Sequence, residues 1–139
     1  GAVTAASGVP LAQDGDLVAP GQILIAPGDM HLRVKSAGGK VIAVTDRGQP
    51  ENSCRPAADV LFRSAAETWG GAVVAAIMTG MGQDGLKGTQ ALASLGAYVV
   101  AQDEASSVVW GMPGAVATAG LAHAVVGLDE IVEEISRQF

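Results

Sequence analysis

Residues 72–85 read AVVAAIMTGMGQDG. The first half is an unbroken run of seven apolar residues, Ala72–Met78, and the second half is a loop with three glycines and one aspartate, Asp84. A short apolar run bounded by glycine is typical of a strand in a parallel sheet that is covered on both faces. The stretch therefore predicts a buried β-strand that ends in a glycine-rich, acidic loop.

Helical and strand patterns alternate on both sides of this strand. A helix with an apolar face is predicted from Pro56 to Gly70-Gly71, and a second from about Leu86 to Leu95. Further segments are a strand at 97–101, a short helix after Pro113, a strand at 123–127 and a last helix with one apolar stripe: Leu128, Ile131, Val132, Ile135 and Phe139. This order predicts an α/β fold with a doubly wound, mainly parallel sheet and helices on both faces.

The region from about 22 to 45 has a different, strand-and-turn texture. Met30, Leu32 and Val34 alternate with polar residues, AGG at 37–39 supplies turn glycines, and KVIAVT follows. This pattern predicts an antiparallel β-hairpin. The alternation puts His31 on the polar face, so we expect a solvated histidine without a catalytic role. The chain is thus one domain, with a hairpin region at about 22–45 and βα units at 56–139.

Composition excludes several classes of function. The chain has 139 residues, a net charge of −6 and 49% hydrophobic residues. The acidic balance disfavours nucleic-acid binding, and no apolar run reaches the roughly 18 residues of a membrane span. Cys54 is the only cysteine, which excludes an internal disulfide and a cysteine-based zinc site. A reducing cytoplasm suits this composition best.

Acidic residues follow two of the predicted strands. Asp84 comes after Ala72–Met78, and Asp103 and Glu104 come after the strand at 97–101. Ligands gather beyond the carboxyl ends of parallel strands, so the three acids are expected at one rim of the sheet. Asp84 could cap the helix from Leu86, orient a catalytic histidine, or join the other two acids in a Mg²⁺ site. GMGQDG also fits G-x-G-x-x-G, but the acid stands where phosphate charge would arrive, which disfavours nucleotide binding.

The residues alone supply no partner for a catalytic Asp84. His123 opens a strand, which places it at the amino end of the sheet and far from Asp84, and His31 lies in the hairpin. No serine stands in a G-x-S-x-G turn, the strand-to-helix turn that exposes a nucleophile; the serines are Ser7, Ser36, Ser53, Ser64, Ser94, Ser106, Ser107 and Ser136. Reasoning from residue types therefore gives an orienting acid without a nucleophile or a base.

Four stretches, taken in order, resemble the C-terminal part of the chemotaxis protein-glutamate methylesterase family (CheB). They are LVAPGQILIAPGDMHLRV (17–34), CRPAADVLFRSAA (54–66), MTGMGQDGLKG (78–88) and AQDEASSVVWGMP (101–113). The resemblance implies a parallel α/β sheet with a hairpin. It also implies hydrolysis of glutamyl methyl esters on chemoreceptors, with deamidation of certain glutamines.

The resemblance also assigns roles to residues. The family uses a Ser-His-Asp triad without a metal or an organic cofactor, and Asp84 matches its acid. Met81 matches the residue whose backbone amide helps to hold the oxyanion. The loop that ends at Met112 and Pro113 is expected to form part of the rim near the substrate. The expected partners are methylated cytoplasmic domains of chemoreceptors, with no nucleic acid and no membrane insertion.

One departure from the family is large. The family's serine and histidine precede the hairpin, whereas this chain starts at Gly1, without a methionine, after both positions. The expectation is a C-terminal fragment of the catalytic domain, with its N-terminal strands missing, that is inactive alone. It would associate with the N-terminal part of its own domain, form a swapped or edge-paired oligomer, or aggregate; a receiver domain stays open as a further partner. A Mg²⁺-binding, receiver-like phosphotransfer module and a non-catalytic adaptor that binds receptors stay open as alternatives.

Overall fold

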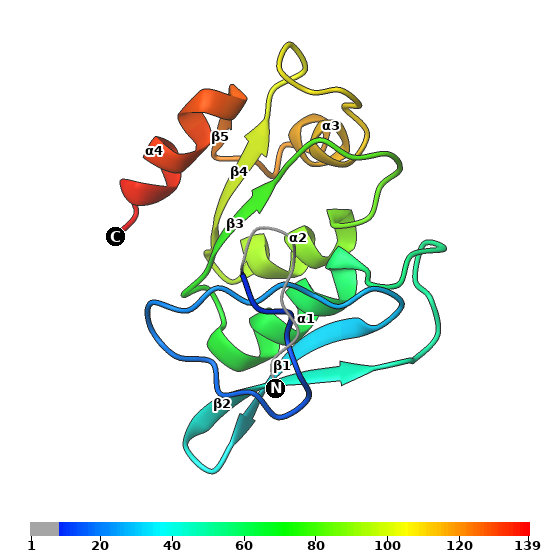
Figure 1. The fold of residues 1–139 in the computed structure, drawn as a ribbon. Helices are drawn as coiled ribbons and strands as arrows, with labels where there is room; N and C mark the ends of the chain where they lie inside the picture. Colours follow the sequence, from blue (N-terminus) through cyan, green and yellow to red (C-terminus); the bar gives the residue numbers. More distant parts are fainter. Residues whose placement is uncertain (1–8) are drawn as a thin grey trace.

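The computed structural model describes residues 9–139, which form a hairpin packed on a helix and, beside it, a small sheet with helices (Figure 1). A 3₁₀ turn, η1, precedes the last helix. The elements in chain order are β1 (His31–Ala37), β2 (Lys40–Asp46), α1 (Ala58–Trp69), β3 (Val74–Ile77), α2 (Leu86–Ser94), β4 (Tyr98–Gln102), α3 (Met112–Thr118), β5 (Ala124–Val126), η1 (Leu128–Glu130) and α4 (Ile131–Ser136).

The predicted parallel sheet is confirmed. Its strands lie in the order β3-β4-β5, and both pairs are parallel, with Val74 opposite Tyr98 and Val100 opposite Ala124. Helices α3 and α4 lie on opposite sides of these strands, as a doubly wound sheet requires (Figure 1). The core between β3, β4, α2 and α3 consists of small and branched aliphatic side chains, with Leu92, Val99 and Val116 fully buried.

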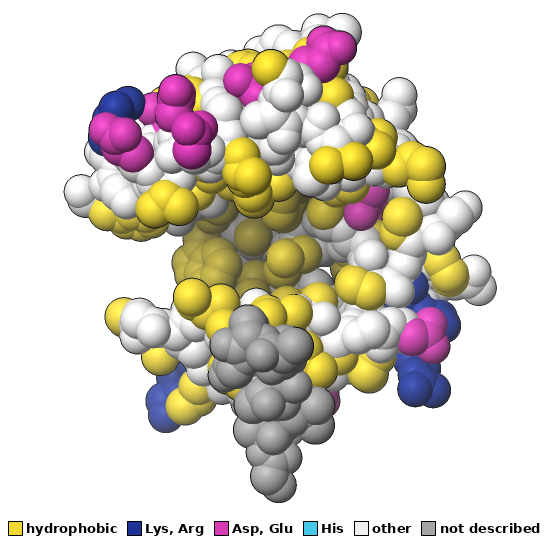
Figure 2. Space-filling model, turned by 45° about the horizontal axis from the view of Figure 1, so that its top comes forward, with side chains coloured by type: hydrophobic (Ala, Val, Ile, Leu, Met, Phe, Trp, Pro, Cys, Tyr) yellow, Lys and Arg dark blue, Asp and Glu magenta, His cyan; other side chains and the backbone are white. Residues whose placement is uncertain are grey.

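Strand β3 differs from its prediction. It is shorter than Ala72–Met78, and Val74 and Ala76 are only half-buried, while Met78 is 42% exposed. The expectation of cover on both faces is wrong for β3, because Val74 and Ala76 point to the same face of the sheet and that face is only partly covered. Figure 2 shows that one face of the molecule is hollowed, and that mainly hydrophobic side chains line the hollow.

The hairpin prediction is confirmed, and the hairpin is joined to α1. Gly38 and Gly39 form the two-residue turn with φ of +58° and +79°, the combination that a type I′ turn needs. The Val34 N–H donates to Ser64 Oγ at 3.0 Å, and Thr68 Oγ1 donates to the Val34 carbonyl at 3.3 Å. These bonds hold the hairpin against the helix.

The two helices at the ends of the βα region differ from their predictions. Helix α1 begins at Ala58 and not at Pro56, although it ends at Gly70 as expected. The last helix buries only Ile131 of its predicted apolar stripe, and Val132 and Phe139 are largely exposed. Helix α4 has just 6 residues, too few to present two full turns to the sheet. No described helix has the length and apolar character that crossing a bilayer requires.

An ion pair at the start of the βα region gives a first testable prediction. The Arg63 guanidinium donates two hydrogen bonds to Glu51, which hold the pKa of that carboxyl below its usual range. A carboxyl group whose pKa is lower in the folded than in the unfolded protein stabilises the fold at pH values above its unfolded-state pKa. This stabilisation is lost as the pH falls through the folded-state pKa. We expect Arg63→Gln to reduce the free energy of unfolding by less than about 1 kcal/mol near neutral pH, because the pair is partly exposed.

Urea unfolding of the full-length protein between about pH 3 and 7 measures this difference. It should disappear as the pH falls from about 4 through the lower, folded-state pKa of Glu51. Lys40→Gln, which removes an exposed positive charge at the start of β2, is the control for loss of a surface charge. A difference that grows toward acid pH would contradict the assignment.

Candidate functional site

Asp84 is buried at the N-terminus of α1. It is 6% exposed, and its two carboxylate oxygens accept hydrogen bonds from the backbone N–H groups of Ala58, at 2.7 Å, and Asp59, at 3.0 Å. The predicted alternative, a cap for the helix from Leu86, is wrong, because the N-cap of α2 is Gly85 and the Asp84 carboxylate bonds to the start of α1 instead. Asp84 instead caps a helix that begins 26 residues earlier in the chain.

A second buried aspartate, Asp59, makes the reciprocal contact. It is fully buried in the first turn of α1, and its Oδ1 accepts from the N–H of Gly88 in α2 at 2.7 Å. Its Oδ2 accepts from Asn52 Nδ2 at 2.8 Å. The N-terminus of α1 is therefore capped by Asp84, which directly precedes α2, and the N-terminus of α2 is capped by Asp59 of α1. Sequence reasoning missed Asp59, since an acid in a first helical turn ordinarily faces solvent.

The Asp84 carboxylate keeps acceptor capacity beyond its two hydrogen bonds to α1. An ionised carboxylate has about four lone-pair sites, and the two backbone amides use two of them. Asp84 lines a mainly apolar cavity of about 290 Å³ with Ala26, Leu32, Pro56, Ala57, Ala58 and Leu61. A cavity of about 150 Å³ accommodates a benzene ring, so this one has room for an imidazole beside the carboxylate.

The glycine-rich loop is held against the segment that leads into α3. The Gly80 N–H donates to the Val109 carbonyl at 3.0 Å, and the Gly80 carbonyl accepts from the N–H groups of Gly111, at 3.1 Å, and Met112, at 2.9 Å. Thr79 Oγ1 accepts from the Val109 N–H at 2.9 Å and donates to its carbonyl at 3.0 Å. The contact admits no side chain at Gly111, whose Cβ would lie 2.8 Å from the Gly80 carbonyl oxygen.

Met81 lies at the tip of this loop. Its side chain is 83% exposed, and its N–H donates no hydrogen bond within residues 9–139. An uncommitted backbone N–H at the end of a strand is a suitable donor to a negatively charged oxygen. The sequence-based role of Met81 depends on this amide.

Met112 and Pro113 occupy the first turn of α3. The Met112 sulfur lies over Gly80, 2.5 Å from the position of a Cβ built there, so the thioether occupies the space of the absent side chain. Pro113 is fully buried, so it offers no surface to a substrate, contrary to the expectation of a rim residue. Pro113 stands at N1 or N2 of α3, where proline is favoured because its missing N–H would have no partner within the helix.

Gln102 connects the two loops, and sequence reasoning missed it. It is buried at the end of β4; its Oε1 accepts from the Thr79 N–H at 2.8 Å, and its Nε2 donates to the Ser106 carbonyl at 2.8 Å. Its own carbonyl accepts from Trp110 Nε1 at 2.8 Å. No local sequence pattern marks Gln102, because its partner Thr79 lies 23 residues earlier in the chain.

The other two candidate acids do not join Asp84. Asp103 accepts from the hydroxyl and the backbone N–H of Ser106, bonds that lower the pKa of the Asp103 carboxyl, and Glu104 is exposed. Asp84 contacts α1, whereas Asp103 closes a local turn. In the described part of the chain, no three His, Cys, Asp or Glu side chains are placed to hold a metal ion. The three acids follow the carboxyl ends of the parallel strands β3 and β4, as expected, but the alternative of a Mg²⁺ site built from them is wrong.

The two histidines occupy different ends of the molecule. The expectation that His31 is solvated is wrong, because it is 0% exposed and both ring nitrogens are hydrogen-bonded. The loop between β2 and α1 covers the polar face of the hairpin at this position. His123 is exposed and precedes β5, as expected; its Nδ1 accepts from the Val99 N–H at 3.0 Å.

Comparison with known proteins places this arrangement in a family. The family model described as CheB methylesterase matches residues 4–135. The chain belongs to the CheB methylesterase family. The fold supports the same conclusion: the catalytic domain of Thermotoga maritima CheB methylesterase superposes with a TM-score of 0.91 at 39% identity, over 95% of this chain and 70% of that one.

Curated relatives agree with the CheB assignment. A protein of Caulobacter vibrioides named protein-glutamate methylesterase/protein-glutamine glutaminase 2 is 54% identical over 86% of this chain and 35% of its own length. A Rhodopseudomonas palustris protein with the same activities in its name is 49% identical over 91% of this chain and 32% of its own length. The chain thus spans about a third of the length of these relatives.

Proposed function

We propose that this CheB chain supplies the acid of a Ser-His-Asp triad to a protein-glutamate methylesterase, and that the acid is Asp84. The observation that carries the proposal is the carboxylate itself: buried, held in one orientation by two backbone amides, and open on one side to a cavity with room for a ring. A triad acid needs this fixed orientation, because it sets the tautomer and direction of the histidine.

The serine and histidine come, in this proposal, from residues outside these 139, in the part of the relatives that the chain does not span. The serine attacks the ester carbonyl while the histidine takes its proton; the Met81 N–H donates to the oxyanion. The histidine then protonates the departing methoxide to methanol, and water hydrolyses the glutamyl-serine ester. With a glutamine side chain, the same steps release ammonia. The reaction needs neither a metal nor an organic cofactor.

The proposed substrates are methylated glutamates in cytoplasmic domains of chemoreceptors, which makes the protein part of chemotaxis signalling in the cytoplasm. Met112, the half-buried residue beside the glycine-rich loop, contributes to the substrate rim. The proposed partners include a receiver domain and the N-terminal part of the catalytic domain. The relatives' names support an enzyme over a receptor-binding adaptor or a phosphotransfer module.

Methanol release tests this function. Full-length enzyme incubated with methyl-labelled receptor membranes should release labelled methanol, and the 139-residue chain alone should release none above the buffer rate. Absence of release by the full-length enzyme, with receptor binding retained, would favour the adaptor. Release by the chain alone would mean that its own residues complete the site.

A further inference from the structure

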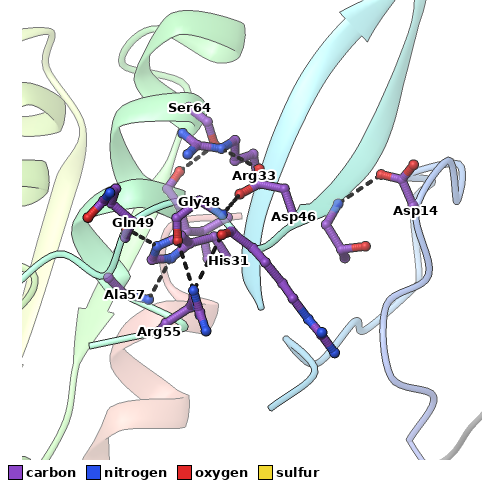
Figure 3. Close-up of polar contacts among 12 residues, drawn as sticks. Asp14, His31, Arg33, Asp46, Gly48, Gln49, Arg55, Ala57 and Ser64 are labelled. Carbon is purple, nitrogen blue, oxygen red and sulfur yellow. Dashed lines mark hydrogen bonds and ion pairs between the residues drawn. The ribbon is translucent and has the colours of Figure 1, made fainter. Parts of the chain in front are cut away.

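His31 is a fully buried group that the proposed mechanism leaves unused, and both of its ring nitrogens have defined partners (Figure 3). Nδ1 lies 3.3 Å from the backbone nitrogen of Ala57, and Nε2 lies 2.8 Å from the carbonyl oxygen of Gln49. A backbone N–H can only donate and a carbonyl can only accept. The ring therefore carries its proton on Nε2 and presents a lone pair at Nδ1.

The contact with Ala57 lies at the start of α1. Ala57 is the N-cap of this helix and has no side-chain oxygen with which to cap it. The first N–H groups of a helix need acceptors from elsewhere. Here three consecutive amides find them on distant side chains: that of Ala57 on His31, and those of Ala58 and Asp59 on Asp84.

The residues around the imidazole ring are themselves held in place by polar contacts. The Asp46 carboxylate accepts from the Gly48 N–H at 2.8 Å, and Arg55 donates to the Gly48 carbonyl at 3.3 Å. A Cβ at Gly48 would lie 3.8 Å from Cδ2 of His31, so this turn packs beside the imidazole. Arg55 is anchored in turn by Asp29 at 2.6 Å. These contacts favour the ring orientation in which Nδ1 faces the Ala57 N–H.

We propose that His31 is a positioning residue for Asp84: its Nδ1 fixes the Ala57 amide and thereby the two N–H groups that orient the Asp84 carboxylate. The proposal rests on the proposed function, because it assigns His31 to the same site. His31 touches neither Asp84 nor a substrate in this scheme. Its effect passes through one peptide group at the start of α1.

Two isosteric substitutions in the full-length enzyme separate the two ring contacts. In His31→Asn the side-chain oxygen takes the place of Nδ1 and can still accept from Ala57, whereas in His31→Gln the side-chain amide nitrogen takes the place of Nε2 and can only serve Gln49. We expect His31→Gln to lower kcat about tenfold to 100-fold with little change in KM, since a misplacement of about 1 Å can cost 100-fold. His31→Asn should stay within about threefold of the wild type.

His123→Gln is the matched control, because His123 also accepts a backbone N–H at Nδ1 but lies at the amino end of the sheet. It should leave kcat within about twofold. Equal losses in His31→Asn and His31→Gln would overturn the proposal. If His31→Gln does not fold, His31→Asn decides alone: a folded variant with more than tenfold loss would contradict a role through Ala57.

A double-mutant cycle and an exchange measurement complete the test. If His31 acts through Asp84, adding His31→Gln to Asp84→Asn should lower kcat no further; additive losses would overturn the proposal. Hydrogen exchange of the Ala58 and Asp59 amides should be faster in His31→Gln than in His31→Asn and the wild type. Exchange does not depend on activity, so it decides the role of His31 even if the wild type releases no methanol and the proposed function fails. Unchanged exchange would contradict the proposal.

Discussion

Replacing Asp84 by asparagine in the full-length enzyme is expected to lower kcat about 10⁴-fold, the loss seen when the acid of a Ser-His-Asp triad is made neutral. An asparagine would present its amide group to the histidine and favour the wrong tautomer. The structure adds a second consequence. Asparagine has one acceptor oxygen for the two amides of Ala58 and Asp59, so its NH₂ would face one of these N–H groups. We expect a loss in the free energy of unfolding of about 1–3 kcal/mol.

Asp59→Asn separates the two consequences. Asp59 is also buried and also accepts a backbone N–H at a helix start, that of Gly88, but its carboxylate does not line the Asp84 cavity. The control should lose a similar amount of stability and far less of kcat. Initial rates of methanol release and urea unfolding give both quantities. A loss of kcat under tenfold in Asp84→Asn would leave Asp84 as a helix cap only.

Gly111→Ala is expected to have the second-largest effect on turnover, a loss in kcat of about 100-fold. The new Cβ would lie 2.8 Å from both the Gly80 carbonyl oxygen and the Gly82 nitrogen. Both are backbone atoms, so no side-chain rotation relieves the contact and the glycine-rich loop must move. In the proposed mechanism, that movement displaces the Met81 N–H from the oxyanion. Overpacking should also cost about 1–3 kcal/mol of stability.

Gly28→Ala is the control for this prediction. A Cβ at Gly28 meets no atom within 4 Å, and its φ is not in the left-handed region. The variant should therefore match the wild type in kcat and in unfolding. Wild-type kcat in Gly111→Ala, with the fold intact, would show that the position of the loop does not matter to the oxyanion.

The sequence predicted the order of the elements well, because local patterns report it. The change from alternating residues in the hairpin to helical spacing after Pro56 marks the start of the βα units. The turn at Gly38-Gly39 needs residues that tolerate positive φ, so its location was also readable. The order β3-β4-β5 agrees with the tendency of consecutive strands to lie side by side.

Two errors at the candidate site concern contacts between segments about 25 residues apart, which leave no local signal. Asp84 stands just before α2 and looks like its cap, yet it reaches Ala58 in α1. His31 alternates with apolar neighbours and looks solvated, yet the segment from Gln49 to Ala57 folds over it. The role proposed for Asp84 comes from the resemblance to a family, since a carboxylate after a strand has several uses.

A structure of the full-length enzyme tests the central claim most directly. We predict a histidine from outside this chain in the cavity beside Asp84, with one ring nitrogen within hydrogen-bonding distance of the carboxylate, about 2.6–3.2 Å. The other ring nitrogen should face a serine hydroxyl, and that serine should lie close to the Met81 amide. A full-length structure in which Asp84 contacts only α1, while a serine and histidine pair elsewhere, would contradict the account.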